Sequence, residues 1–298
     1  MPTPLFRSIK KFLWTAAQQT DFTWRYLLHA DAAGRQLLRT ERLAGVVTQV
    51  ARGLKREGVA AIPADQLLAG NPCLDDLIGA VDRLELTMAT RVESARLDLD
   101  PLGAQPQKPF VVPLLASNQI LDRSQIFARF ALQAPILQVV NAYFGMIVEL
   151  THTNVWHTLV SRQPPTQSQL WHRDPEDRHV LKVFLYLSDV DEGSGPLTYA
   201  LGSHKRPYQI APHSYQDGET ARSTDEELAQ MIPRHRWLTL TVPRGTMVFA
   251  DTRGYHKGGL ARSRDRIAYV AEYLPRTGVG ISTGHALSPR TARNAAMS

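Results

Sequence analysis

Apolar residues recur with two different spacings, one along the first 145 residues and another after them. In the segment 31–58 the leucines and valines return at close to 3.6 residues, which predicts a helix that stops at Gly58. The segment 63–97 continues in the same way, and Asp75 or Asp76 falls where the first turn of a helix favours a negative charge. This part of the chain is therefore predicted to be mainly helical.

Proline and glycine divide the rest of the helical half. Residues 100–113 are rich in both and predict a connector. Residues 124–145 predict one more helix, kinked or broken at Pro135 and closed at Gly145. The first 22 residues lack the uninterrupted apolar core of a secretory signal. An amphipathic helix on a membrane surface would fit them, but they favour a helix that packs four apolar side chains against the body: Phe6, Ile9, Phe12 and Leu13.

After residue 145 apolar and polar residues alternate and β-branched residues become frequent, which predicts strands. Turn signals with Gly and Pro separate these segments. The polar segment 215–233 predicts a loop with a short helix, and the residues after Leu274 predict a tail. The predicted strands are 146–160, 180–190, 235–242, 245–251 and 266–274, with a short strand inside 193–205.

The order of these segments predicts the fold class. Many short strands at regular spacing are typical of a sandwich or barrel, and helices that precede strands indicate an α+β chain. We therefore expect a single catalytic domain over residues 1–298. It would comprise a mainly helical portion at 1–145, an antiparallel β-barrel core at 146–275 backed by the helices, and a tail at 276–298.

The strand predicted at 180–190 has two unlike faces. Because side chains alternate along a strand, one face is entirely aliphatic and the other carries Lys182, Phe184 and Tyr186. We expect the aliphatic face to meet the helices and the mixed face to look into the barrel. Lys182 would there suit an acidic group of a cofactor or substrate, or it would extend to the rim.

A pair of ligand-type residues stands just before this strand. His172 and Asp174 are two residues apart, so on an extended segment both side chains point the same way. An imidazole and a carboxylate on one face can hold a metal ion, and they form two-thirds of a triad of two histidines and one carboxylate. Trp171 points to the opposite face by the same alternation and is expected in the core.

The third ligand is expected late in the barrel. His256 precedes two glycines, which allow a ligand to approach the backbone closely. Further on, Arg266 opens the last predicted strand, and its planar guanidinium can pair with a carboxylate through two hydrogen bonds. A 2-oxo acid could take two of the three remaining metal positions and dioxygen the third, while Arg266 holds the distal carboxylate of the acid.

These residues form a combined pattern: His172-x-Asp174, the segment SDVDEGSGPLTYALGSHK, then His256 and Arg266. Over residues 110–275 the pattern resembles the phytanoyl-CoA dioxygenase family of Fe(II)- and 2-oxoglutarate-dependent oxygenases. The resemblance implies a double-stranded β-helix (jelly-roll) core with Fe(II) bound by His172, Asp174 and His256. It also implies 2-oxoglutarate anchored by Arg266, consumption of O2, and hydroxylation of an unactivated C–H bond.

The chain departs from that family pattern in places. Gly258 stands where the family often has a small hydroxyl residue, and Arg264 is a rival to Arg266 because the family arginine varies in position. Family halogenases carry a small residue in place of the carboxylate. Because Asp174 fills that position, we expect hydroxylation or a related oxidation and not halogenation.

Ten histidines are present, and most are expected to be structural. His157 lies on the strand before the His-x-Asp pair and is expected to line the pocket together with Lys182 and Phe184. His179, His213 and His235 are expected to be exposed or structural.

Composition limits the compartment and the binding partners that we expect for this protein. The single cysteine, Cys73, excludes an internal disulfide and fits a reducing, cytoplasmic location. The net charge of +6 is spread among acidic residues, which favours a small or carrier-bound substrate that could be anionic over nucleic acid. The sequence contains no stretch of 18 or more apolar residues, so no transmembrane helix is expected. The oligomeric state is left open.

Two other functions remain compatible with the sequence. The same three ligands could bind zinc in a hydrolase or in a non-catalytic binding protein, although hydrolysis needs no carboxylate anchor such as Arg266. An oxidative nucleic-acid demethylase would account for the positive charge. It would need a basic groove with stacking aromatic residues, and no clustered run of basic and aromatic residues is seen in the sequence.

Overall fold

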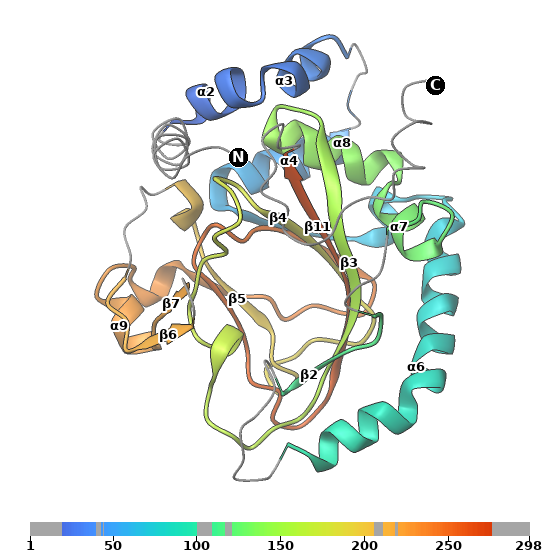
Figure 1. Cartoon of the computed structure of the whole chain (residues 1–298), viewed down its shortest axis with the longest axis vertical. Coiled ribbons are helices and arrows are strands. Elements are labelled where there is room, and N and C mark those ends of the chain that lie inside the picture. The colour runs from blue at the N-terminus through green and yellow to red at the C-terminus, as the bar shows by residue number, and fades with distance from the viewer. Residues whose placement is uncertain are drawn as a thin grey trace, which may run out of the picture.

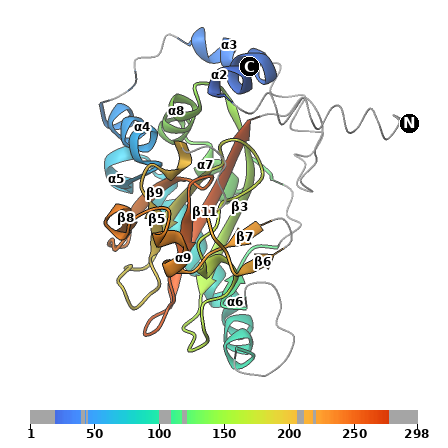
Figure 2. The ribbon, with the colours of Figure 1, turned by 90° about the vertical axis from the view of Figure 1, so that its left-hand side faces the viewer.

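The computed structural model describes residues 20–39, 43, 45–99, 109–116, 121–205, 211–217 and 220–275. Within them, two antiparallel sheets face each other and helices cover the outer face of the larger sheet (Figures 1 and 2). This is the α+β class with a double-stranded β-helix core that the sequence predicted. The helix expected around Phe6 and the tail after residue 275 lie outside the described residues.

The helices come mostly from the first half of the chain. Among them α4 ends at Glu57, where Gly58 adopts a positive φ of 85°, and α6 carries Asp75 and Asp76 in its first turn, both as predicted. The α- and π-helices are α2 (Asp21–Thr23), η1 (Trp24–Leu28), α3 (Ala30–Leu37), α4 (Gly45–Glu57), α5 (Ala64–Leu67), α6 (Cys73–Leu97), α7 (Ile126–Ala131), α8 (Ala134–Phe144) and α9 (Asp225–Ala229). Short 3-10 turns are η2 (Gln167–Gln169), η3 (Ser203–Lys205) and η4 (Arg234–Arg236).

The break predicted at Pro135 separates α7 from α8. Pro135 lies in the first turn of α8, where its missing N–H costs no hydrogen bond. Gly145 ends α8 in the left-handed conformation with φ 66°, and its N–H bonds to the carbonyl of Asn141. Both expectations for this segment are confirmed.

The larger sheet has six strands in the order β1-β9-β4-β11-β3-β2, and all neighbouring strands are antiparallel. Its central strands β4 and β11 carry the face that looks toward the second sheet. The strands are β1 (Val59–Pro63), β2 (Val111–Pro113), β3 (Val148–Thr158), β4 (Leu181–Tyr186), β9 (Thr246–Asp251) and β11 (Arg266–Pro275).

The smaller sheet and a separate hairpin complete the strands. The smaller sheet has the order β10-β5-β8, and β6 pairs only with β7 among the described residues. The hairpin lies in the segment 215–233, which was predicted to be a loop with a short helix; only the helix, α9, was foreseen. These strands are β5 (Leu197–Ala200), β6 (Tyr215–Asp217), β7 (Thr220–Arg222), β8 (Trp237–Thr239) and β10 (His256–Gly258).

Two strands of the larger sheet come from the half predicted to be helical. β1 follows Gly58 directly and pairs along its whole length with β9, while β2 closes the predicted connector and pairs with β3. Both are too short for an alternating pattern to stand out against neighbouring helices. They become strands because they pair with the long strands β9 and β3. This tertiary pairing cannot be inferred from the local sequence.

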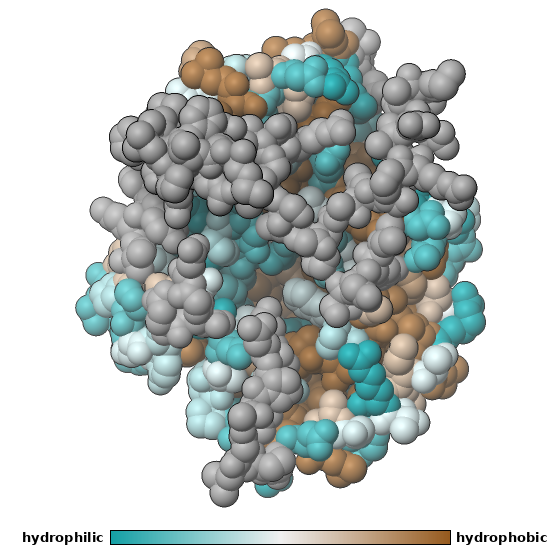
Figure 3. Space-filling view, viewed as in Figure 1, coloured by the Kyte–Doolittle hydropathy of each residue, from teal (hydrophilic) through white to brown (hydrophobic). Residues whose placement is uncertain are grey.

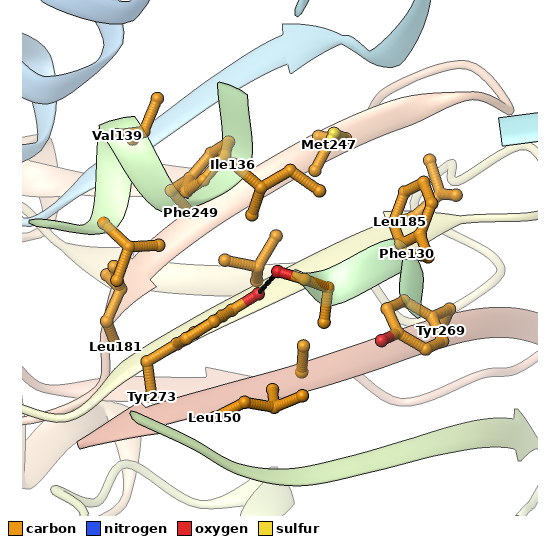
Figure 4. Packing of buried hydrophobic residues seen from close by; sticks show 14 of the residues in the cluster. Phe130, Ile136, Val139, Leu150, Leu181, Leu185, Met247, Phe249, Tyr269 and Tyr273 are labelled. Carbon is orange, nitrogen blue, oxygen red and sulfur yellow. Dashed lines mark hydrogen bonds between the residues drawn. The ribbon is translucent and has the colours of Figure 1, made fainter. Parts of the chain in front are cut away.

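The aliphatic face of β4 packs against the helices, as predicted. Leu181 and Leu185 lie in one buried cluster with Ile136 and Val139 of α8 (Figure 4). Within this cluster the Tyr273 hydroxyl donates a 2.7 Å hydrogen bond to the carbonyl of Ala131, so the phenol is buried without an unpaired oxygen. The packing fixes the outer face of the sheet and thereby the direction of its inner face.

The inner face of the larger sheet packs against the smaller sheet. Phe184 and Tyr186 of β4 share a second buried cluster with Leu197 and Tyr199 of β5. The Phe184 and Tyr186 rings stack with centroids 6.4 Å apart. The predicted orientation of the mixed face is therefore confirmed, and the space between the sheets is where the candidate site lies.

The surface adds two observations. Among the described residues no helix is both long and apolar enough to cross a bilayer. Phe22, Leu27 and Leu37 are exposed, and apolar surface is visible at the upper edge of the space-filling view, over α2 and α3 (Figure 3).

Candidate active site

Two backbone hydrogen bonds bring the segment before β4 and the start of β10 together. The His172 N–H donates to the His256 carbonyl at 3.0 Å, and the His256 N–H donates back to the His172 carbonyl at 3.1 Å. The Asp174 N–H donates to the carbonyl of Thr252 at 2.9 Å. The extended segment around His172 thus joins the smaller sheet, and residues far apart in sequence become neighbours.

The side chains of His172, Asp174 and His256 converge. One ligand atom from each lies within 4.8 Å of the others, and all three residues are buried. Nε2 of His172 is 3.9 Å from Oδ1 of Asp174, and Nε2 of His256 is 3.9 Å from Oδ2. Among the described residues this is the one group of three or more potential ligands that meets so closely.

The backbone sets the orientation of both imidazoles. Nδ1 of His172 lies 2.8 Å from the Leu170 carbonyl, and Nδ1 of His256 lies 3.0 Å from the Gly254 carbonyl. Each Nδ1 must carry the proton in order to donate to a carbonyl, which leaves a lone pair on each Nε2. The donor set therefore fits a divalent metal ion, because both available imidazole nitrogens and a carboxylate face the same point.

Burial and charge favour the ionisation states that a metal needs. Burial, together with the neighbouring imidazole of His256, holds the pKa of His172 well below its ordinary value, so the ring is neutral. Burial alone would raise the pKa of Asp174, but the Lys182 ammonium outweighs burial and lowers that pKa. The site thus presents the neutral imidazole of His172 and the Asp174 carboxylate, with Nε2 of His256 facing them.

Lys182 lies inside the barrel and not at the rim. Its Nζ donates to Oδ2 of Asp174 at 2.6 Å and lies 3.5 Å from a carboxylate oxygen of Glu272. Burial opposes the charged ammonium, yet Asp174, Glu272 and Glu176 raise the pKa of Lys182 above its ordinary value. The acidic group that Lys182 meets is therefore a side chain of the protein.

A cavity of about 220 Å³ opens beside the three residues. Its lining includes His172, Asp174, His256, Lys182 and Arg266. Most of the remaining wall is apolar, from β2, β3, β4 and their surroundings: Phe110, Val111, Pro113, Trp156, Phe184 and Leu197. A small molecule can enter a mostly dry space in which a few polar groups fix its orientation.

The Arg266 guanidinium has hydrogen-bonding capacity to spare. Its Nη2 donates to Oγ1 of Thr158 at 3.4 Å, and its Cζ lies 6.0 Å from the centre of the Tyr186 ring. Its Nη1 is buried and makes no hydrogen bond with any residue in the described part of the chain. Burial lowers the pKa of Arg266, but a guanidinium stays charged. A carboxylate of a bound acid would satisfy this group.

The rival arginine occupies a different environment. Arg264 is 64% exposed at its side chain and forms a 2.6 Å ion pair with Asp191 on the surface. Arg264 and Arg266 share strand parity in sequence, but Arg264 precedes β11 and stands outside the residues that line the cavity.

The expectation that His157 lines the pocket is wrong. Trp156 and Thr158, its neighbours on β3, line the cavity, so alternation turns His157 to the outer face of the sheet. There Nε2 of His157 lies 2.8 Å from Oδ2 of Asp265, and Nδ1 lies 3.3 Å from Glu85 of α6. Lys182 and Phe184, the other two residues expected in the pocket, do line it.

Sequence reasoning missed several lining residues. Trp156 and Thr158 could have been found from alternation on β3 once one position of that strand was placed. Phe110, Val111 and Pro113 belong to the predicted connector, and no local signal indicated that they would reach the cavity.

The remaining sequence predictions in this region concern core and structural residues. Trp171 is fully buried on the side opposite His172 and donates from Nε1 to Asp225 at 2.6 Å. His179 is structural: Nδ1 lies 2.6 Å from Asp251 and Nε2 lies 3.2 Å from Asp21. Both findings agree with the predictions.

Comparison with known proteins identifies the class. The fold and the site define a non-haem oxygenase that depends on iron and 2-oxoglutarate. Residues 113–268, just over half of the chain, match the family described as phytanoyl-CoA dioxygenase (PhyH). The chain belongs to this family, and the resemblance seen in the sequence is confirmed. No curated protein sequence is significantly similar to it.

Solved structures share the fold. The epimerase SnoN, in complex with Fe3+, alpha ketoglutarate and nogalamycin RO, is 16% identical with a TM-score of 0.51, covering 81% of this chain and 92% of SnoN. AviO1 from Streptomyces viridochromogenes Tue57 is 19% identical with a TM-score of 0.51, covering 81% and 99%. EctD from S. alaskensis with bound Fe is 19% identical with a TM-score of 0.52, covering 76% of each chain.

Proposed function

We propose that this oxygenase hydroxylates an unactivated C–H bond of a small or carrier-bound metabolite, with iron held by His172, Asp174 and His256 and 2-oxoglutarate anchored by Arg266. The observation that carries the proposal is the convergence of the three ligand atoms within 4.8 Å, in one cavity with a buried guanidinium that has an unused donor. The bound iron supplies the activation of dioxygen, coupled to oxidation of 2-oxoglutarate to succinate and carbon dioxide.

The chain's own residues bind, orient and exclude water. The Leu170 and Gly254 carbonyls keep the proton on the outer nitrogen of each imidazole, so that both inner nitrogens stay available. Lys182 neutralises Asp174 and fixes the direction of its carboxylate. The apolar walls keep the cavity dry, which strengthens the pairing of Arg266 with a distal carboxylate.

Two features favour hydroxylation. Asp174 occupies the carboxylate position that halogenases leave open, so the expected oxidation delivers oxygen to the substrate. The substrate space next to the ligands is bounded by Trp156, Phe184 and Leu197, which suits the apolar carbon skeleton that presents an unactivated C–H bond.

The alternatives have less support. A zinc hydrolase would have no use for a buried arginine with an open donor in the same cavity. A nucleic-acid demethylase would need unpaired basic surface, yet several arginines in the described residues form ion pairs with acids. Examples are Arg178 with Asp21, Arg234 with Glu226 and Arg264 with Asp191.

The anchor is tested by binding of two 2-oxo acids to the Mn(II)-loaded protein, measured by calorimetry. Pyruvate keeps the chelating end of 2-oxoglutarate but lacks the distal carboxylate. Arg266→Gln is expected to weaken 2-oxoglutarate binding by about 10- to 100-fold, as for the loss of a charge-assisted hydrogen-bonded pair. It should leave pyruvate binding unchanged, and Arg264→Gln, the matched control, should affect neither ligand.

The reaction is tested by measuring succinate formation with iron, 2-oxoglutarate and a panel of small and carrier-bound substrates. Substrate-dependent succinate together with a product heavier by one oxygen atom supports hydroxylation. A product that has lost two hydrogens or inverted a stereocentre without gaining oxygen would contradict it. Equal weakening by Arg264→Gln and Arg266→Gln in the binding experiment would contradict the assignment of the anchor.

A further inference from the structure

A network of charged side chains lies behind the arginine, on the outer face of the larger sheet. Asp265 directly precedes Arg266, and in an extended segment consecutive side chains point to opposite faces. Arg266 therefore faces the cavity while Asp265 faces α6. The paired strand β3 repeats this arrangement, because Thr158 lines the cavity and His157 points outward.

Four donors converge on the Asp265 carboxylate. Nε2 of His157 lies 2.8 Å from Oδ2, and the Val160 N–H donates to Oδ1 at 2.8 Å. Arg96 of α6 donates to both oxygens, at 2.5 Å from Nη2 and 3.3 Å from Nη1. The side chains of His157 and Asp265 are 13% and 20% exposed, so their contact is partly shielded from solvent, whereas the Arg96 side chain is 38% exposed.

Helix α6 holds the network from two points. Arg96 and Glu85 lie about three helical turns apart and therefore on the same face of the helix. Arg96 contacts Asp265, and Glu85 lies 3.3 Å from Nδ1 of His157. Figure 1 shows α6 running along one side of the barrel beside β3. One helix thus ties down both strands, β3 and β11, at the end where Thr158 and Arg266 meet.

On the cavity side, Arg266 contacts only the side chains of Thr158 and Tyr186 among the described residues. Its hydrogen bond to Thr158 is long, at 3.4 Å, and its Nη1 has no bond with a described residue. The direction of the guanidinium therefore also depends on its backbone, which pairs with Thr158 of β3 and directly follows Asp265.

We propose that Asp265, gripped by His157 and Arg96, is a positioning residue that aims Arg266 and so sets the affinity of the site for the distal carboxylate of 2-oxoglutarate. The inference rests on the proposed role of Arg266 as the anchor. In this account α6 contributes to co-substrate binding although none of its residues lines the cavity.

The charge state of His157 agrees with the geometry. Burial opposes the imidazolium, but the hydrogen bonds with Asp265 and Glu85 outweigh burial and raise the pKa of His157 to about 9. Burial likewise opposes ionisation of Asp265, while His157 and Arg96 lower its pKa. At neutral pH the network is therefore two cations around a carboxylate, with Glu85 beyond.

The test compares binding of 2-oxoglutarate and of pyruvate to Mn(II)-loaded variants by calorimetry. Asp265→Ala and, from the other side of the contact, His157→Gln are expected to weaken 2-oxoglutarate binding roughly tenfold, as for loss of a residue that orients a direct ligand contact. Pyruvate binding should not change, because pyruvate has no carboxylate for Arg266. Asp265→Asn retains one acceptor oxygen, which can serve the Val160 N–H and Nη1 of Arg96, and should recover part of the affinity.

Asp82→Asn is the matched control, since Asp82 lies on α6 but is exposed and forms only a long ion pair of 3.9 Å with Arg244. Thermal unfolding of each variant identifies those that retain the fold, and His157→Gln keeps the test open if Asp265→Ala fails to fold. Suppose that Arg266→Gln weakens 2-oxoglutarate binding selectively. The inference is then overturned if the folded Asp265 and His157 variants bind both 2-oxo acids equally more weakly, or bind both as tightly as the wild type. Absence of a selective effect in Arg266→Gln would instead overturn the proposed anchor.

Discussion

Two adjacent glycines show how single residues place a ligand. Gly258 and Gly259 follow His256, and the Gly259 N–H donates to the Pro196 carbonyl at 2.8 Å. A Cβ on Gly259 would lie 2.7 Å from the Pro196 carbonyl oxygen, whereas a Cβ on Gly258 would meet its nearest neighbour, the Ser168 carbonyl oxygen, at 3.6 Å. The Gly-Pro-Leu turn of the sequence motif therefore packs directly on the chain that carries His256.

These distances predict opposite outcomes for two neighbouring substitutions. Gly259→Ala should lower the free energy of unfolding by about 1–3 kcal/mol, because two backbones must move apart. Gly258→Ala should change it by less than about 0.5 kcal/mol, as for a substitution that meets no obstacle. Urea unfolding of both variants checks the prediction, and a Gly258→Ala loss as large as that of Gly259→Ala would refute it.

At the same scale, the candidate site was largely predictable from residue types and spacing. The interval of two between His172 and Asp174, and the place of His256 before two glycines, led to three residues that do converge. The prediction for His157 failed because the sequence identified its strand but not which face of the sheet the side chain would occupy. The register with β11 assigns the side chain to the outer face.

Among the elements, the N-terminal helical segment is tied to the loop that follows Asp174. Nε1 of Trp24 in η1 donates to Asp177 at 2.8 Å, and Nε of Arg178 donates to Asp21 of α2 at 2.6 Å. His179 lies between the two parts, 2.6 Å from Asp251 of β9 and 3.2 Å from Asp21. These contacts hold one ligand-bearing loop against both the barrel and the helices.

This junction predicts a pH dependence of stability. Burial opposes a charge on His179, but Asp251 and Asp21 raise its pKa to about 9, above the ordinary value of 6.5. The other groups facing the ring are Tyr143, which donates to Asp251, and Trp24. Because the folded-state pKa is raised, the stabilisation is fully present below pH about 6.5 and is lost as the pH rises through about 9.

The unfolding free energy of the wild type should therefore fall by about 1–3 kcal/mol between pH 6.5 and 9.5 relative to His179→Gln. Urea unfolding across this range measures the difference. His213→Gln, which removes an exposed histidine, is the control and should run parallel to the wild type. A constant difference between wild type and His179→Gln at all these pH values would contradict the account.

Sequence patterns identified the long elements and failed on the short ones. The face of β4 and the break at Pro135 follow from alternation and from proline chemistry, both of which act within one element. β1, β2 and the β6–β7 hairpin have three to five residues each, and they exist because longer strands or turns offer them partners. Such pairing partners cannot be inferred from the local sequence.

At the scale of the whole molecule, the apolar core and the space between the two sheets serve different functions. The helices and the outer face of the larger sheet form the main apolar core, which holds the sheet's inner face toward the smaller sheet. The cavity between the sheets then receives one ligand-bearing segment from each of two distant parts of the chain. The barrel thereby converts residues separated by more than eighty positions into one site, which is the central claim of this account.

Anaerobic equilibrium binding of Fe(II) tests that claim most directly, in the wild type and in His172→Ala, Asp174→Ala and His256→Ala, with His213→Ala as the control. One ion per chain is expected in the wild type and the control. Each ligand variant should bind Fe(II) more weakly by about a hundredfold or more, since loss of a ligand exceeds the effect of losing a residue that orients one. Unchanged affinity in any folded variant of the three would contradict the account.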